Sequence, residues 1–267
     1  MNPRKLSYAK ATNSALDKNS SHVFAQKHAL NLYSMSAICT YIPKNACSTL
    51  RLSIAIANGC LDSIDEHEWI HQNNQTFVAS LSELIKAEYT FTFLRCPFRR
   101  LASLFLDKIV SKDRVAWTYY DAIHKQTELD DLNFSSFVRS LRNPNVLMRD
   151  HHWRPQKDFL VYQRYDDYFC VEDMASAIVT LNNTIGFSIV DAREKTKHGS
   201  DGFDIIDNVD FTKNRARHFF GMKLKNTLPS YKSLYNDELI ETVAAIYGKD
   251  IDLYSQECGS ANLLFEL

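Results

Sequence analysis

The chain has 267 residues, of which 45% are hydrophobic, so it can bury a full core. Its formal net charge of −1 argues against a general nucleic-acid-binding protein, which would be strongly basic. The sequence shows no signal-peptide pattern and no apolar run of membrane-spanning length, so we expect a soluble, cytoplasmic protein without a transmembrane segment.

The domain organisation is inferred from the absence of linkers. The sequence contains no proline-, glycine- or serine-rich linker, no low-complexity tract and no internal repeat. We therefore expect one domain at residues 31–267, preceded by a weakly patterned segment at residues 1–30. The six cysteines form no CxxC pair and no metal-ligand spacing, which predicts reduced thiols and no structural metal.

The first clear unit is a strand, a loop and a helix. Residues 37–42 (AICTYI) predict a short buried strand, which Pro43 stops. A helix should follow at residues 48–58, with Ser48 as its N-cap and Gly59 as its C-terminal stop. Apolar residues surround the axis of this helix, which is typical of a helix buried against a sheet.

A second unit of the same kind follows. Residues 89–95 (YTFTFLR) have the aromatic and β-branched content of a central strand. Pro97 suits the first turn of a helix that should run to about residue 110. Arg99 and Arg100 are expected to be solvated charges on its surface.

The later elements complete the expected fold. The pattern predicts a helix at residues 134–141, a strand at 167–173, a helix at 174–182, a polar loop at 194–210, and a helix that Asn236 caps and Gly248 ends. Strands that alternate with helices predict an α/β protein, with a mainly parallel central sheet flanked by helices.

The first loop, IPKNACST at residues 42–49, has the features of a phosphate site. The start of a helix offers unpaired N–H groups and a partial positive charge, and Lys44 adds a full charge. An ATP-binding P-loop needs glycines and a lysine directly before the hydroxyl residue, whereas here the lysine comes four residues before Ser48. This departure disfavours a nucleoside or sugar kinase. The alternative is a plain turn with a surface lysine.

Arg95 ends the second strand. Ligands of open α/β sheets bind beyond the carboxyl ends of the strands, where both Lys44 and Arg95 should lie. A guanidinium suits a bidentate phosphate contact, and a salt bridge to a nearby carboxylate is the structural alternative.

Five segments of the sequence resemble motifs of a known family. IPKNACSTLR resembles the 5'-phosphosulfate-binding loop of sulfotransferases that use 3'-phosphoadenosine 5'-phosphosulfate (PAPS), in the variant of the Golgi carbohydrate sulfotransferases and their bacterial relatives. FTFLRCPFRRLASLF resembles the family's 3'-phosphate motif, and HWRPQ, RYDDYFCVEDM and YNDELIETVAAIYGKDIDLY are similar to later segments in the family's order. Cys96 departs from the acidic residue that is common there, and the absence of an anchor and of lumenal cysteine pairs favours the soluble bacterial form.

The resemblance implies the P-loop-NTPase-like fold of the sulfotransferases and transfer of a sulfuryl group to a carbohydrate or glycolipid. PAPS would be the donor and 3'-phosphoadenosine 5'-phosphate (PAP) the product, with no metal. Carried over by position, Arg95 and Ser103 would hold the 3'-phosphate. The 5'-phosphosulfate would contact Lys44, Asn45, Ala46, Cys47, Ser48 and Thr49. A non-catalytic nucleotide-binding protein of the same fold is the alternative, and the sequence does not indicate the oligomeric state.

Sulfuryl transfer needs a base for the acceptor hydroxyl, and histidine suits this role near neutral pH. His152, in the HWRPQ segment, is the first candidate and His151 the second, although His152 could simply hold its loop. The further alternatives are His67, His71, Glu66 and Asp107. The aromatic residues that could form a sugar-stacking wall, or could equally belong to the core, are Trp117, Tyr119 and Tyr120.

Overall fold

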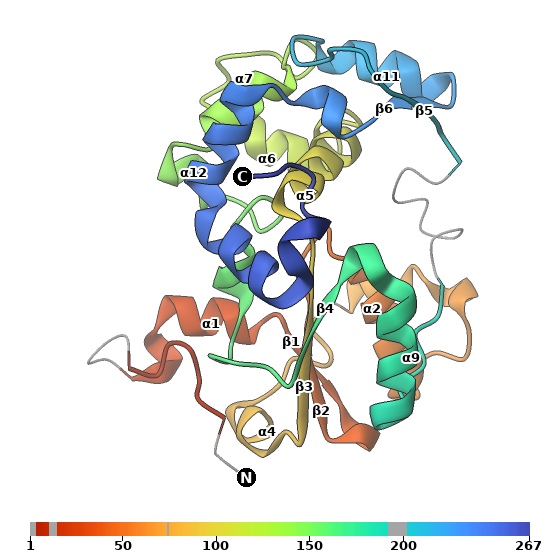
Figure 1. Cartoon of the computed structure of the whole chain (residues 1–267). Coiled ribbons are helices and arrows are strands. Elements are labelled where there is room, and N and C mark those ends of the chain that lie inside the picture. Colours follow the sequence, from red (N-terminus) through yellow and green to blue (C-terminus); the bar gives the residue numbers. More distant parts are fainter. Residues whose placement is uncertain (1–3, 11–14, 74, 192–201) are drawn as a thin grey trace. The chain divides into compact units, whose positions relative to one another are not determined.

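A computed structural model (Figure 1) describes residues 4–10, 15–73, 75–191 and 202–267. The chain forms two compact units, and its path alternates between them. Unit 1 comprises Met1–Arg95 and Gln156–Lys197, and unit 2 comprises Cys96–Pro155 and His198–Leu267. No helix in the described ranges is long and apolar enough to cross a membrane.

The sheet of unit 1 has four strands in the order β1-β2-β3-β4. The strands are β1 (Ala29–Leu32), β2 (Ala37–Thr40), β3 (Tyr89–Leu94) and β4 (Asp167–Cys170). The pairs β2–β3 and β3–β4 are parallel, and β1–β2 is antiparallel. The α/β class with a mainly parallel sheet is therefore confirmed. Strand β1 was not predicted, and the expected boundary between residues 30 and 31 falls inside it.

Helices flank this sheet on both sides. In Figure 1, α2 (Cys47–Ala57) and α9 (Met174–Ile185) lie on one side of the strands, whereas α1 (Ser20–Gln26) and α4 (Leu81–Lys86) lie on the other. The short helix α3 covers Trp69–Gln72. All residues of β1, β2 and β3 are buried, as expected for parallel strands covered on both faces. The core between the sheet and α2 includes packed rings of Phe91, Phe93 and Phe169.

The sequence predicted the C-terminal end of α2 correctly but not its N-cap. Its N-cap is Ala46, one residue before Cys47, so the expectation that Ser48 caps the helix is wrong. At the other end, Gly59 adopts φ 73°, and its N–H donates to Ile56 O. The next N–H, from Cys60, donates to Ala55 O, which completes a Schellman motif. The predicted stop at Gly59 is therefore confirmed.

Unit 2 is mainly helical. It contains α5 (Pro97–Leu104), a π-helical turn (Phe105–Ile109), α6 (Arg114–Ala122), α7 (Phe134–Ser140), α8 (Pro144–Leu147), α11 (Ala216–Leu224) and α12 (Asp237–Tyr254). The described part of this unit also holds a two-stranded parallel sheet of β5 (Asp204–Ile206) and β6 (Thr227–Pro229). Helix α12 packs against α5 and α7, and buried phenylalanines fill the space between helices.

Three expectations for unit 2 need correction. Asn236 caps α12 as predicted, but Gly248 does not end the helix, which continues to Tyr254 with one non-helical residue at Tyr247. Arg100 is not a solvated charge, since it is only 3% exposed. The polar loop expected at 194–210 contains β5, and its residues 194–201 lie outside the described residues.

Candidate functional site

The lysine loop, residues 42–49, connects β2 to α2 in an unusual conformation. Lys44 and Ala46 both have positive φ angles, 71° and 55°, although neither is glycine. The N–H of Asn45 between them donates to Ile42 O at 3.0 Å, which closes a turn. Left-handed residues in such a turn form a concave group of backbone N–H donors, an arrangement that binds anions. Each left-handed non-glycine residue costs about 1–3 kcal/mol and persists only where surrounding contacts hold it.

Asn45 supplies one of those contacts. Its side chain is fully buried, and its Nδ2 donates to Phe93 O at 2.7 Å and to Gln156 Oε1 at 2.6 Å. Both the Nδ2 group and the backbone N–H of Asn45 therefore donate inside unit 1, whereas its buried Oδ1 has no hydrogen-bond partner among the described residues. The donors of this residue hold the loop against β3.

Gln156 completes the clamp between the two strand ends. Its Oε1 accepts from the Arg95 backbone N–H at 3.1 Å as well as from Asn45, and its Nε2 donates to Arg95 O at 2.9 Å. Gln156 is 1% exposed. It was missed as a functional residue, although it is the last residue of the HWRPQ segment, and that segment was the available signal.

Arg95 lies directly against the lysine loop. Its Nη1 donates to Lys44 O at 2.8 Å, and both residues are half-buried. The proximity follows from the sheet, because β2 and β3 are parallel neighbours, with Thr40 opposite Thr92. The expectation that Lys44 and Arg95 lie together is confirmed.

This edge of the sheet suits a phosphorylated ligand. The Arg95 guanidinium bonds the backbone of a second basic residue, Lys44, and the first turn of α2 adds N–H donors with the positive end of a helix dipole. The N-cap Ala46 has no side-chain oxygen to satisfy these donors. Ser48 and Thr49 are half-buried in the same first turn. The residues present therefore fit a phosphosulfate or phosphate group.

Ser103, the second residue predicted to hold the 3'-phosphate, belongs to unit 2. It lies in α5 and is 5% exposed. Helix α5 is buried on almost every side, and its Arg100 donates to Arg154 O at 2.9 Å and to His151 O at 3.4 Å. The helix thus anchors the loop that carries His152.

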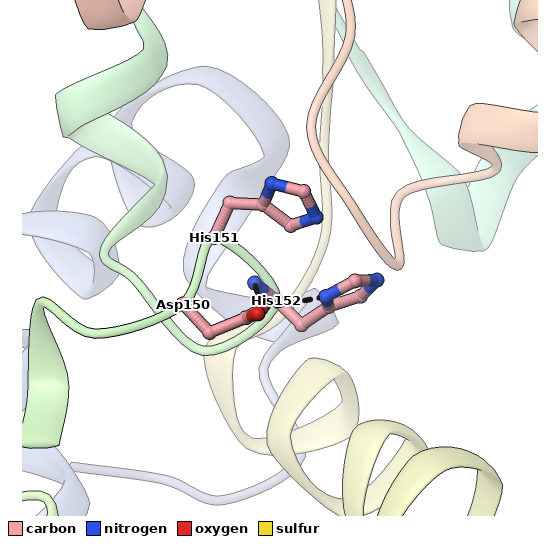
Figure 2. Close-up of side chains that lie close together, drawn as sticks. All are labelled: Asp150, His151 and His152. Atoms are coloured by element: carbon pink, nitrogen blue, oxygen red, sulfur yellow. Dashed lines mark hydrogen bonds and ion pairs between the residues drawn. The ribbon is translucent and has the colours of Figure 1, made fainter. Parts of the chain in front are cut away.

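The histidine loop, residues 150–154 of unit 2, contains a hydrogen-bonded pair (Figure 2). Asp150 Oδ1 accepts from the backbone N–H of His152 at 2.8 Å and meets its Nδ1 at 2.7 Å. Burial alone would raise the pKa of Asp150, but hydrogen bonds and charge from His152, with charge from His151, outweigh burial and hold this pKa below its ordinary value. Asp150 was missed from sequence, where nothing marks a carboxylate two residues before a histidine as its partner.

Other candidates for the base have structural roles or exposed positions. Glu66 Oε2 accepts from the backbone N–H groups of Asp62 and Ser63 in a helix capping box. Asp107 forms an ion pair with Lys108 at 3.4 Å. His67 Nε2 lies 3.2 Å from Glu68, and His71 is exposed on α3. His152 differs from His67 in that its carboxylate partner, Asp150, is largely buried, whereas Glu68 is 79% exposed.

The aromatic candidates separate into core and surface. Tyr119 is 1% exposed, and its hydroxyl pairs with Ser140 Oγ at 2.9 Å, so it belongs to the core. Trp117 is 53% exposed and packs edge-on against Tyr120, with ring centroids 5.8 Å apart. Of the three, exposed Trp117 and half-buried Tyr120 are the ones that could offer a ring face to a sugar.

The fold is that of an α/β protein with basic residues at two adjacent strand ends, and comparisons identify its family. The sequence profile described as the sulfotransferase family matches residues 34–255, so this chain belongs to that family. Carbohydrate sulfotransferase 14 of Homo sapiens is 27% identical over 129 residues, and human carbohydrate sulfotransferase 10 is 28% identical over 130 residues. These matches cover 43% and 42% of this chain but only 34% and 35% of the relatives. No solved structure matches the chain.

Proposed function

We propose that this chain transfers a sulfuryl group from PAPS to a hydroxyl of a carbohydrate or glycolipid. The observation that carries the proposal is the contact between Arg95 and the Lys44 carbonyl at the ends of two adjacent parallel strands. Family membership supports the reaction class, and the names of the two human relatives support the acceptor class.

In the proposed site, the lysine loop binds the 5'-phosphosulfate. Lys44 neutralises its charge, and N–H groups of the loop and of the first turn of α2 donate to its oxygens. Ser48 and Thr49 add hydroxyl donors. Asn45 contributes indirectly by holding the loop in place, because its own donors already bond within unit 1.

Arg95 is assigned to the 3'-phosphate. Its Nη1 contacts Lys44 O, and a guanidinium carries further N–H groups that suit a phosphate. Ser103 keeps its proposed part in this contact by resemblance. With Lys44 and Arg95 engaging the two ends of the nucleotide, the donor is fixed in one orientation.

Bound PAPS supplies a sulfuryl group on a phosphate that is a stable leaving group. The acceptor oxygen attacks sulfur in line, a new S–O bond forms, and the bond from sulfur to the bridging phosphate oxygen breaks. Lys44 and the loop N–H groups stabilise the negative charge that builds on that oxygen. The hydroxyl proton passes to His152, so the products are PAP, the sulfate ester and one proton. Positioning and charge stabilisation thus supply most of the catalysis, as in phosphoryl transfer.

His152 is proposed as the base because its ring bonds to a carboxylate and because of its place in the chain. Four residues after it comes Gln156, which bonds both the lysine loop and Arg95. The acceptor class and a cytoplasmic location are likewise proposals. A glycan panel tests the first and cell fractionation the second.

The test is transfer of labelled sulfate from PAPS to a panel of glycans and glycolipids. We expect transfer by the unmodified chain, a loss of about 100-fold or more in kcat for Lys44→Ala, and no change for Lys86→Ala, an exposed lysine of the same unit. Thermal stabilisation by PAP checks donor binding separately. Undiminished transfer by Lys44→Ala would remove this lysine from the mechanism, and PAP binding without transfer would favour a non-catalytic nucleotide-binding protein.

A further inference from the structure

The aspartate of the histidine loop binds its histidine in a specific way. One oxygen, Asp150 Oδ1, accepts from the backbone N–H of His152 and from the Nδ1 atom of the same residue, at 2.8 and 2.7 Å. In Figure 2, dashed lines join the Asp150 carboxylate to the backbone nitrogen and to the nearer ring nitrogen of His152, and the rest of that ring points away from the carboxylate. The two side chains are 17% and 19% exposed, so solvent screens this pair only partly.

This contact determines which ring nitrogen is available for chemistry. An ionised carboxylate only accepts hydrogen bonds, so Nδ1 must carry a proton to bond to Asp150. The neutral ring then has its lone pair on Nε2, the nitrogen on the far side from the carboxylate. Asp150 remains ionised at neutral pH, because its hydrogen bonds with His152 hold its pKa below the ordinary value in spite of burial.

The rest of the loop is held rigidly within unit 2. Trp153 is fully buried and donates from Nε1 to Val146 O at 2.7 Å. Tyr247 of α12 donates to Trp153 O at 2.5 Å, and Arg100 of α5 donates to the carbonyls of Arg154 and His151. The backbone on both sides of His152 is therefore fixed, which fixes the starting point of its side chain.

His151 is the other titratable group beside this ring. The two imidazole centroids are 4.4 Å apart, and His151 is exposed. The Arg100 guanidinium also reaches the carbonyl of His151, at 3.4 Å. Ligand atoms of Asp150, His151 and His152 lie within 4.8 Å of one another, a spacing that a metal ion could bridge. The direct bond between Oδ1 and Nδ1 favours a proton-carrying pair over a metal site.

We propose that Asp150 is a positioning residue that holds His152 with Nε2 ready to accept the proton of the acceptor hydroxyl, and that it stabilises the imidazolium formed in that step. This inference rests on the proposed sulfuryl transfer. During transfer the acceptor O–H bond breaks, its proton passes to Nε2, and the oxygen forms the new bond to sulfur while the phosphate oxygen leaves with its electron pair. Asp150 keeps its charge throughout and transfers no proton.

The experiment compares the full chain with Asp150→Asn, His152→Gln and the double variant, with Asp121→Asn as an exposed control from the same unit. Sulfate transfer is measured from pH 5 to 9. For Asp150→Asn we expect kcat to fall about 10- to 100-fold, part of what a general base contributes, with KM for PAPS within about twofold. The double variant should be no slower than His152→Gln.

Imidazole ¹⁵N spectra of the same proteins give a readout that does not need turnover. The unmodified chain should show His152 with protonated Nδ1 and unprotonated Nε2, and Asp150→Asn should show mixed tautomers. A protonated Nε2 in the unmodified neutral ring would overturn the inference, as would an Asp150→Asn variant that keeps the wild-type kcat. Loss of activity with a chelator and recovery with Zn²⁺ would assign the cluster to a metal instead and also overturn it. Absence of transfer by the unmodified chain would refute the proposed function, and the spectra would still decide the tautomer.

Discussion

Two buried amide side chains, Asn45 and Gln156, hold the lysine loop in a shape that ATP-binding P-loops reach with glycine. Glycine adopts left-handed angles without steric cost, whereas Lys44 and Ala46 adopt them at about 1–3 kcal/mol each. The four hydrogen bonds described above, between 2.6 and 3.1 Å, tie the loop and Arg95 to one another and offset that strain. The absence of glycine from the loop therefore does not prevent anion binding.

Replacing Gln156 by Ala should loosen this clamp. The variant leaves buried polar groups of Asn45 and Arg95 without their partner, which costs about 1–3 kcal/mol per group. We expect a lower melting temperature and PAP binding weakened by roughly 10-fold, measured by calorimetry. Gln163→Ala, at an exposed glutamine of the same unit, is the control and should change neither. Wild-type PAP affinity in Gln156→Ala would show that the loop does not need the clamp.

At the scale of elements, the conformation of two glycines determines the effect of adding a side chain. Gly248 lies inside α12, and a Cβ added there would meet no atom of another element within 4 Å. Gly59, in contrast, has φ 73° at the end of α2. Alanine restricts the unfolded chain and favours a helix, but it is strained at a positive φ.

Gly248→Ala should therefore raise the free energy of unfolding by about 0.5–1 kcal/mol, and Gly59→Ala should lower it by about 1 kcal/mol or more. Urea denaturation of both variants checks the two signs side by side. A stabilised Gly59→Ala variant would contradict the Schellman motif at the end of α2.

The elements that were predicted from sequence are those with strong local signals. Strands β2 and β3 are apolar runs bounded by proline, and α5 begins with proline at its first turn. Strand β1 is only four residues long and lacks such a boundary, and Gly248 resembled a helix end although α12 continues beyond it to Tyr254.

The candidate site was predictable from sequence only where a general rule about strand ends applied. The rule that ligands bind beyond parallel strand ends placed Lys44 beside Arg95. The HWRPQ segment marked the region of Gln156, but the partners of Gln156 and the role of Asp150 were not predictable, because both depend on contacts in three dimensions. Gln156 meets Asn45 across 111 positions of sequence, and no local pattern encodes such a contact.

At the scale of the whole molecule, local charge matters more than net charge. The chain carries a formal charge of −1, yet Lys44 and Arg95 concentrate positive charge at one edge of the sheet. The family match at residues 34–255 runs through both units, with the lysine loop in unit 1 and the histidine loop in unit 2.

The most direct test of the central claim measures the affinities of PAP and of adenosine 5'-phosphate, which lacks the 3'-phosphate, by titration calorimetry. If Lys44 and Arg95 hold opposite ends of one nucleotide, the unmodified chain should bind PAP roughly 10- to 100-fold more tightly than adenosine 5'-phosphate. Arg95→Ala should lose most of that preference, whereas Lys44→Ala should weaken both nucleotides by a similar factor. An Arg95→Ala variant that keeps the wild-type preference for PAP would contradict the account.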